Sequence, residues 1–454
     1  MADGKRRRKL LVLPSDVVSE ILLRLPVQSL KRIKCVCKPW NDLISDSSFV
    51  KEHANRAKNC TNRLKVLVST EGPAPLSIDY EDLLKHEEGY GHASTQLKID
   101  ISSNCSYEHA SNLYLINIVG SCNGLICLHG VGRISHHPRA FVVVWNPSTG
   151  DTSTLPAPRF LKSRNSILPK LFGFGYDSST EDYKVMLGNM SSSGTECITK
   201  IHLFSLKTGS WRCYEESRRI ESNEYVKMGG QGCLSNGALH WIELVFDSRR
   251  RLDGSRSRIV AFDLAEEKFR EMASLSSFMG KEYLDKITVS SESSYIYIGI
   301  GITIENVWAM KECGIEKSWT KLLHIPLEIL VPVYKDYLVR EHKDVDIDMS
   351  DYLFPVHILE DGKVLMSCDQ KKLVLYDPKE NTKRTILETC LSSYAVVYVE
   401  TLISPRIGGG ADMISKQHNG EEEEASKKHA MTSCLNFNKV VLNICRKPWM
   451  GRTY

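Results

Sequence analysis

Two cysteines, Cys35 and Cys37, stand one residue apart between lysines in the segment KCVCKPW. A redox pair, a metal site and a piece of packed helix are the alternatives that such spacing raises. In a helix, residues two apart point about 200° from each other, so their sulfur atoms neither share a metal nor form an unstrained disulfide. The chain has no CxxC pair, and no histidine stands nearby at zinc-finger spacing. We therefore expect both cysteines to be structural.

A third cysteine lies in a motif associated with catalysis. The segment GSCNG fits the nucleophile-elbow pattern, with Cys122 in the place of the serine. An elbow needs a helix after it, but the LICLHG that follows predicts another strand. The segment FGFG at 172–175 lacks the strand–turn–helix setting of a phosphate-binding loop and indicates a close backbone approach. We predict no catalytic residue.

Histidines and cysteines gather between residues 127 and 137. Cys127, His129, His136 and His137 carry side chains of the types that bind metals. Neighbouring residues of a strand face opposite ways, however, and the proline that follows His137 indicates a loop. The sequence favours ordinary loop histidines, and we predict neither a metal site nor a cofactor.

A dense basic cluster, RRRLDGSRSR, occupies residues 249–258, in what the sequence predicts to be a long loop between strands. Guanidinium groups match phosphate and carboxylate oxygens in pairs, so the cluster is a candidate surface for an acidic or phosphorylated protein. A solvated insertion is the alternative. Interleaved aromatic residues that would stack bases are absent, so we predict no nucleic-acid partner. The candidate binding residues are Arg249, Arg250, Arg251, Arg256 and Arg258.

Length and composition limit the classes of protein to which the chain can belong. A chain of 454 residues is expected to form two folded units or one large repeat assembly. The apolar fraction of 42% and the charged fraction of 25% are ordinary for a soluble globular protein. No apolar run approaches the ~18 residues of a membrane span, and the N-terminus lacks a signal-peptide pattern. We expect reduced cysteines, a cytoplasmic or nuclear location and no membrane partner.

Positive charge is concentrated near the N-terminus. Residues 1–60 hold thirteen Lys and Arg against six Asp and Glu, a net charge of +7, although the whole chain carries +4. The run KRRRK fits a nuclear localisation signal, and a solvated basic tail over residues 1–9 explains it equally well. A basic head on a near-neutral body indicates either an acidic partner or such a signal.

Three short helices are predicted in residues 10–57. Pro14 opens the first helix, Pro26 ends it and Pro39 opens the third, because proline is tolerated only in the first turn of a helix. Apolar residues at helical spacing mark one face of each helix. The residues expected to face inward are Val17, Val18, Ile21, Leu22, Leu25, Leu30, Ile33, Val36, Cys37, Trp40, Leu43 and Ile44, with Phe49 and Val50 on a further turn.

The segment LPSDVVSEILLRLPVQSLKRIKCVCKPWNDLISDSSFVKEH closely resembles the F-box of plant F-box proteins. Gln28 stands where the pattern usually has a basic residue, and Pro39 fills a variable slot. The resemblance implies a three-helix module that docks onto a small Skp-type adaptor and, through it, joins a cullin–RING ubiquitin ligase. The adaptor-binding and supporting positions that it implies are Leu13, Pro14, Ile21, Leu22, Leu25, Pro26, Leu30, Val36, Cys37 and Trp40.

Residues 62–403 predict an all-β domain built from a repeated unit. The segments VVVWNPSTGDTSTLP, IHLFSLKTGSWRCYE, IVAFDLAEEKFREM and LVLYDPKENTKRTI each give a strand, a polar turn and a second strand. Tryptophans at or beside these strands are expected to pack between them. The turns open at Asn146, Ser205, Asp263 and Asp377, with a missing member near Met310, and the tryptophans are Trp145, Trp211, Trp241 and Trp319.

Further hairpins lie between these units. A period near 57 residues with two hairpins per unit is close to a four-stranded propeller blade. Five units are visible, and a sixth is expected to combine strands in 62–118 with SYAVVYVETLI at 393–403, which would close a ring. A distorted β-sandwich is the alternative. The hairpins are predicted to turn at Asn123-Gly124, Asn236-Gly237 and Asp361-Gly362, residue pairs that suit type I′ turns.

The segments CNGLIC, WNP and FGFGYDSSTEDYKV resemble the F-box-associated domain of the same plant family. The expected fold class is α+β multidomain: a three-helix F-box, then an all-β, propeller-like domain of about six blades. The resemblance implies a non-catalytic substrate-recognition adaptor of an SCF-type E3 ubiquitin ligase, whose β domain binds an unknown client protein. An F-box scaffold acting outside degradation and a propeller enzyme are the alternatives. Residues 404–454 are expected to be a disordered tail.

Overall fold

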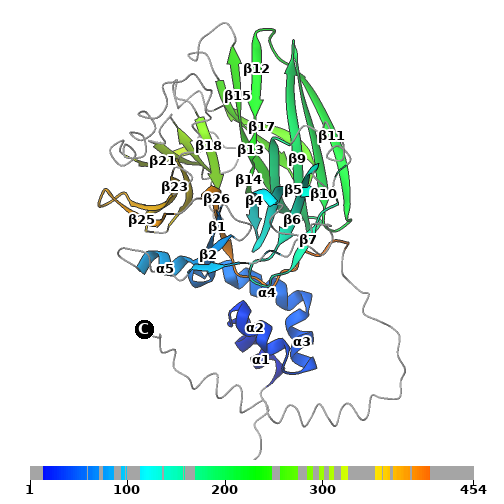
Figure 1. Ribbon diagram of the computed structural model, residues 1–454, viewed down its shortest axis with the longest axis vertical. Coiled ribbons are helices and arrows are strands. Elements are labelled where there is room, and N and C mark those ends of the chain that lie inside the picture. Colours follow the sequence, from blue (N-terminus) through cyan, green and yellow to red (C-terminus); the bar gives the residue numbers. More distant parts are fainter. Residues whose placement is uncertain are drawn as a thin grey trace, which may run out of the picture. The chain divides into compact units, whose positions relative to one another are not determined.

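The computed structural model divides the chain into two compact units (Figure 1). Of the residues that the structure describes, the first unit contains 14–53 and the second contains 54–408. The described residues are 14–58, 60–70, 75–85, 94–97, 99, 113–134, 137–156, 158, 169–247, 256–274, 284–289, 296–300, 306–310, 319–325, 353–359, 361–368, 372–388 and 391–408.

The expected helices form where prolines permit them. Pro14 and Pro26 directly precede the first and second helices, and Pro39 lies in the first turn of the third. The expected further turn is a full fourth helix. It begins after Asp46, whose carboxylate accepts the backbone N–H groups of Ser48 and Phe49 at 2.9 and 3.3 Å. The helices are α1 (Ser15–Leu23), α2 (Val27–Lys34), α3 (Lys38–Ser45) and α4 (Ser47–Lys58).

The two cysteines of the CVC segment lie between helices rather than on one helical face, which corrects the prediction for Cys37. The second helix ends at Lys34, Cys35 follows it, and Cys37 has an extended backbone just before α3. The chain must leave the helix here because Pro39 has no N–H to continue it. Val36 consequently lies 47% exposed instead of facing inward.

The second unit has the propeller-like, all-β architecture expected from the repeats. The described strands form six sheets, and every pairing is antiparallel except that of β13 with β8. Two short helices, η1 (Thr61–Arg63) and α5 (Tyr80–Lys85), accompany the first sheet.

The six sheets are named A to F in this article, and their strands have the following bounds. Sheet A contains β26 (Leu391–Val399), β1 (Leu64–Thr70), β2 (Leu76–Asp79) and β3 (Ser94–Gln96); sheet B contains β4 (Leu113–Cys122), β5 (Leu125–Ile134), β6 (His137–Trp145) and β7 (Thr152–Thr154). Sheet C contains β8 (Leu171–Asp177), β9 (Asp182–Ser193), β10 (Glu196–Ser205), β11 (Ser210–Arg219) and β13 (Gly230–Gln231). Sheet D contains β12 (Glu224–Met228), β14 (Cys233–Ser235), β15 (Ala238–Asp247), β16 (Arg256–Asp263) and β17 (Lys268–Ser274). Sheet E contains β18 (Leu284–Val289), β19 (Ile296–Ile300), β20 (Asn306–Met310) and β21 (Trp319–His324), and sheet F contains β22 (Leu353–Ile358), β23 (Val364–Cys368), β24 (Lys372–Asp377) and β25 (Thr382–Glu388).

The sheets follow one another in a closed ring. One strand of each sheet contacts a strand of the next, in the order β26, β4, β8, β15, β18, β22 and back to β26. The predicted closure is confirmed, because β26 pairs with β1 from Leu64 opposite Val399 to Thr70 opposite Leu391. Figure 1 shows the orange strand β26 beside the blue strand β1. The two ends of the β domain therefore share one sheet.

The repeated strand–turn–strand unit is the outer half of each sheet from B to F. The strands β6, β10, β16, β20 and β24 end at or just before the predicted turn residues, and each pairs with the strand that follows the turn. Asn123-Gly124 and Asn236-Gly237 both have the positive φ angles of type I′ turns. At Asp361-Gly362 only the glycine has a positive φ, so the type I′ prediction is wrong for that hairpin.

Apolar side chains fill the spaces between neighbouring sheets. Trp145 and Trp241 are each 1% exposed and pack as predicted, whereas Trp211 is half-buried against Phe204. The close approach predicted for FGFG is also present. A Cβ atom on Gly173 would lie 2.5 Å from the end of the Leu239 side chain of sheet D, so the glycine makes room for that side chain between sheets C and D.

Residues 400–408, here called the C-terminal strap, continue from β26. The fully buried side-chain amide of Asn146, in the WNP turn, donates to the carbonyl oxygens of Thr401 and Ile403 at 2.9 and 2.7 Å. Its carbonyl oxygen accepts the N–H groups of Ser148 and Thr149. One asparagine thus shapes its own turn and fastens the strap.

The strap makes further hydrogen bonds along its length. The Thr401 hydroxyl donates to the Asn123 carbonyl at 2.9 Å, and the Gly408 N–H donates to the Leu206 carbonyl at 2.9 Å. Residues 404–408, predicted to begin a disordered tail, therefore belong to the β domain. Residues 409–454 lie outside the described residues.

Asn146→Ala is expected to lower the free energy of unfolding of the β domain by about 3 kcal/mol, because two buried carbonyls lose their donor. Urea denaturation of the full chain measures this change. The matched control is Asn189→Ala, which removes one exposed acceptor of the Lys170 N–H and should cost less than about 1 kcal/mol. Equal losses in the two variants would show that Asn146 does not fasten the strap.

Candidate functional site

The ten predicted adaptor-binding and supporting positions differ in how deeply they are buried in the first unit. Leu22, Leu30 and Trp40 are 3%, 0% and 6% exposed, so they pack in the core of the helices, as supporting positions do. Ile21, Leu25 and Cys37 are half-buried. The remaining described positions, Pro14, Pro26 and Val36, are exposed, and Leu13 lies outside the described residues.

Exposed apolar side chains mark the surface of the first unit. Val17 on α1 is 43% exposed and Val36 after α2 is 47% exposed. Among the described residues, only Tyr225 is another large apolar side chain with such exposure. Val17 and Val36 are thus the large apolar side chains that the described fold of the first unit leaves at its surface.

His53 supports the helices in a way that sequence reasoning missed. Its ring is fully buried, and its Nε2 atom lies 3.0 Å from the Leu25 carbonyl oxygen at the end of the first helical segment. The ring also stacks on Phe49 at a centroid distance of 6.3 Å. A histidine one turn after a buried phenylalanine was the only sequence signal for this contact.

Only the last part of the predicted basic cluster lies among the described residues, and there it is a strand. Arg256 and Arg258 belong to strand β16 rather than to a loop, and Arg249, Arg250 and Arg251 lie outside the described residues. The Arg258 Nε atom donates to the Glu243 carboxylate at 2.5 Å.

Glu243 is 2% exposed and receives a second arginine, Arg218 from sheet C. A buried carboxylate needs such partners, because an unpaired charge is costly to remove from water. Arg218 therefore links sheet C to sheet D through Glu243, whereas Arg258 pairs with the same carboxylate from the neighbouring strand of sheet D.

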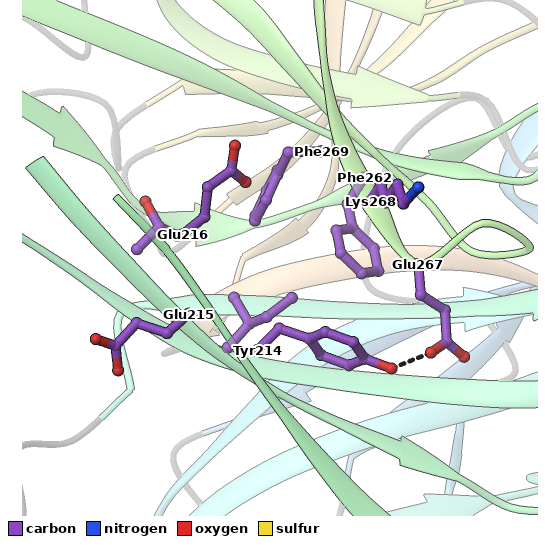
Figure 2. Close-up of a pocket in the computed structure, with 9 residues that line it drawn as sticks. Tyr214, Glu215, Glu216, Phe262, Glu267, Lys268 and Phe269 are labelled. Carbon is purple, nitrogen blue, oxygen red and sulfur yellow. Dashed lines mark hydrogen bonds between the residues drawn. The ribbon is translucent and has the colours of Figure 1, made fainter. Parts of the chain in front are cut away.

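A cavity of about 300 Å³ lies between the outer strands of sheets C and D (Figure 2). Its floor is apolar: Ile201 and Phe262 are each 1% exposed, and the rings of Phe262 and Phe269 meet edge-on at 5.1 Å. The other lining residues are Thr199, Tyr214, Glu215 and Glu216 from sheet C and Glu267, Lys268 and Phe269 from the β16–β17 hairpin of sheet D. This space is here called the C–D pocket.

One end of the C–D pocket is closed by an ionic cluster. Glu267 accepts a hydrogen bond from the Tyr214 hydroxyl and pairs with Lys184 at 2.9 Å and with Arg212 at 2.7 Å. Figure 2 shows the Tyr214–Glu267 contact as a dashed line. Lys184 is buried and also pairs with Asp177 at 3.0 Å.

The carboxylates of this cluster remain ionised. Burial would raise the pKa of Glu267, but hydrogen bonds from Tyr214 and Lys184 outweigh it and lower the pKa. Burial acts likewise on Asp177, where hydrogen bonds from Ser179, Thr180 and Lys184 hold the pKa well below its usual range. The negative charges of the cluster are thus matched by its own cations.

Strand alternation separates two neighbouring glutamates at the pocket. Glu215 pairs across the strands with Lys200, at 3.1 Å, on one face of sheet C. Glu216 lies on the opposite face, with Tyr214 and Thr199. Figure 2 shows the Glu215 side chain extending away from the rings of Phe262 and Phe269. No hydrogen bond or ion pair joins the exposed Glu216 carboxylate to any described residue.

Sequence reasoning missed the C–D pocket. The available signal was the alternation Tyr214–Glu216 in SWRCYEESRR, which places an aromatic residue and an acid on one strand face. That pattern does not reveal which sheet packs opposite, and the pocket needs Phe262 and Phe269 from another sheet.

The residues that suggested catalysis occupy structural positions. Cys122 ends β4 and is followed by the strand β5 rather than by a helix, and burial raises the pKa of its thiol to about 12. In the described part of the chain, no group of three or more His, Cys, Asp or Glu side chains is placed to hold a metal ion. None of the helices that the structure describes is long and apolar enough to cross a membrane.

Comparison with known proteins identifies the class to which this architecture belongs, that of the F-box proteins. Residues 10–52 match the F-box domain, and residues 82–404 match the F-box associated beta propeller domain. The chain therefore belongs to the plant F-box protein family whose members carry an F-box associated β-propeller.

Two relatives from Arabidopsis thaliana match nearly end to end. F-box/kelch-repeat protein At3g23880 is 26% identical over 411 residues, which cover 87% of this chain and 96% of that protein. F-box protein CPR1 is 27% identical over 440 residues, which cover 92% of this chain and 94% of that protein. This chain is similar to both over the F-box and the β domain together.

His129 gives the β domain a predictable response to acid. Its ring is 4% exposed beside Phe172, its two nitrogens have no hydrogen-bond partner among the described residues, and burial lowers its pKa to about 4. Between pH 6.5 and pH 4 the unfolded chain binds a proton that the folded chain does not bind. The free energy of unfolding should therefore decrease as the pH is lowered through this window. For this residue the decrease is about 2 kcal/mol at pH 5.

His129→Leu is expected to reduce the loss of stability between pH 7 and pH 5 by about that amount, measured by urea denaturation at both pH values. The buried His240 and His357, whose pKa values burial lowers to about 4, remain in both proteins and give both a shared acid response. Identical losses in the wild type and the variant would show that His129 is not buried in neutral form.

Proposed function

We propose that this protein is the substrate-recognition subunit of an SCF-type cullin–RING E3 ubiquitin ligase. Its F-box would dock onto a Skp-type adaptor, and its β domain would bind a client protein. The observation that carries the proposal is the F-box unit itself. It has a small helical core, and two valines, Val17 and Val36, and two prolines, Pro14 and Pro26, are exposed on it.

The size of the F-box core supports a docking role. A unit of about forty residues buries too little apolar surface to be very stable alone, so a partner that covers its exposed apolar side chains also stabilises it. Leu22, Leu30, Trp40 and Ile44 are buried within the unit, and the valines at the surface are left for the partner.

The protein would contribute proximity and would catalyse nothing itself. Holding a client near the ubiquitin-conjugating enzyme converts a bimolecular encounter into a local one with a high effective concentration. The β domain suits this task because a closed ring of sheets holds its binding surface rigid relative to its own strands. We propose the cytoplasm, the nucleus or both as the location in which the protein acts.

Val17→Glu and Val36→Glu are expected to weaken adaptor binding at least tenfold, because each puts a charge on an apolar contact surface. Both residues are exposed, so the folding of the F-box should be unaffected. Co-purification of the full chain with a Skp-type adaptor, followed by titration of that complex, measures the change.

The matched control is Ser222→Glu, which adds the same charge at an exposed position of the β domain. Its adaptor affinity should equal that of the wild type. Wild-type affinity in both valine variants would place the adaptor interface elsewhere. A wild-type chain that captures no adaptor would contradict the proposed function itself.

A further inference from the structure

The C–D pocket combines an apolar floor with the exposed carboxylate of Glu216, with which no described residue pairs. Lys268 also lines the pocket, but it precedes Phe269 on β17 and stands opposite Asp263, so strand alternation places its side chain on the other face of sheet D. Ile201 and Phe262 are buried, and Tyr214 and Phe269 are half-buried, so three aromatic rings and one aliphatic side chain line the pocket. An unfilled space against such rings is the kind of site in which an aliphatic stem or a flat cation packs.

Glu216 is the acid that distinguishes this pocket. The two arginines on the same face of β11 are bound elsewhere: Arg212 pairs with Glu267 at 2.7 Å, and Arg218 pairs with the buried Glu243. The other two carboxylates at the pocket are also paired, Glu267 with Lys184 and Glu215 with Lys200. Glu216 thus supplies a negative charge with which no described residue pairs.

We propose that the C–D pocket binds an arginine side chain of the client polypeptide, an inference that rests on the proposed client-binding function. The aliphatic stem would pack on Ile201 and Phe262, and the guanidinium group would stack on Phe269 or Tyr214 and pair with Glu216. A guanidinium group is flat, weakly hydrated and able to donate two parallel hydrogen bonds to one carboxylate, which a lysine ammonium is not.

The size of the pocket limits the occupant to one side chain. A volume of about 300 Å³ is at the lower end of the range for small-molecule sites, and it suits a long, unbranched residue. An acidic side chain is excluded, because it would meet the Glu216 charge in a partly apolar space.

The surrounding strands favour a polypeptide over a free small molecule. Among the described strands, β11 pairs only with β10, and β17 pairs only with β16, so each forms the edge of its sheet. The pocket lies between these two edges. Unpaired backbone groups on an edge strand accept an extended peptide as an added strand, which would deliver its side chain to the pocket.

The first experiment measures single side chains on the full-length chain. N-acetyl-arginine methylamide, its lysine counterpart and the uncharged citrulline counterpart are titrated by saturation-transfer NMR, which detects weak binding to a large protein. We expect the arginine probe to bind more tightly than the lysine probe and at least tenfold more tightly than the citrulline probe. Equal binding of the arginine and citrulline probes, or no binding by either, would overturn the proposal.

Two neighbouring substitutions give a matched test of the site. Glu216→Gln should weaken the arginine probe about tenfold, because it removes the charge and retains the shape. Glu215→Gln removes the same charge one residue away, on the face that pairs with Lys200, and should bind the probe as the wild type does. Loss of binding in both variants, or in neither, would overturn the assignment to the C–D pocket.

A peptide experiment tests the nature of the occupant. A phage-displayed random peptide library is selected on the wild type, on Glu216→Gln and on Glu215→Gln. Arginine should be enriched at one position with the wild type and with Glu215→Gln, and not with Glu216→Gln. A pocket that binds the free arginine probe but enriches no arginine peptide would be a small-molecule site, which contradicts the proposed occupant.

Adaptor capture is measured on the same preparations and separates the two proposals. Glu216→Gln should retain the Skp-type adaptor fully. A wild-type chain that binds the arginine probe but captures no adaptor would remove the ligase function and leave the pocket. A chain that captures the adaptor and does not distinguish arginine from citrulline would remove the pocket and leave the ligase function.

Discussion

The pairing of β26 with β1 is the constraint on which the β domain depends. It joins strands from opposite ends of the domain into one sheet, and without it the ring of six sheets would have two open edges. Asn146 reinforces the pairing from a neighbouring sheet by binding the carbonyls of Thr401 and Ile403. The WNP turn and the CNG turn, both recognisable in the sequence, therefore hydrogen-bond to the same C-terminal strap. Both turns stabilise the closed ring through it.

The contact between sheets C and D contains both buried ion pairs that join the sheets and the C–D pocket. Gly173 makes room between the sheets for the Leu239 side chain, and the Lys184 and Glu243 clusters join the sheets with paired charges. Ion pairs of this kind satisfy buried charges without filling the space between them. The C–D pocket lies beside these clusters, and no described residue pairs with the Glu216 carboxylate in its lining.

Much of this architecture was predictable from the sequence because local patterns determine it. Turn-forming pairs such as Asn123-Gly124 have strict backbone requirements, and prolines such as Pro39 have few permitted positions, so hairpins and helix starts were placed correctly. Contacts between sheets were not predictable, since nothing in the sequence indicates that Arg218 of sheet C pairs with Glu243 of sheet D. A turn pair does not always determine the turn type. Asp361-Gly362 is a pair that suits a type I′ turn, but only Gly362 has a positive φ.

The closure of sheet A also sets an order of events during synthesis. Ser77 and Tyr398 share a hydrogen bond across 321 residues of chain, so the ribosome must complete almost the whole β domain before that sheet can form. The F-box emerges first and can fold from local contacts, whereas long-range strand pairing is slow. A nascent or truncated chain would carry an F-box without a finished recognition domain. The ring of sheets can therefore close only after β26, the last described strand of the domain, has been synthesised.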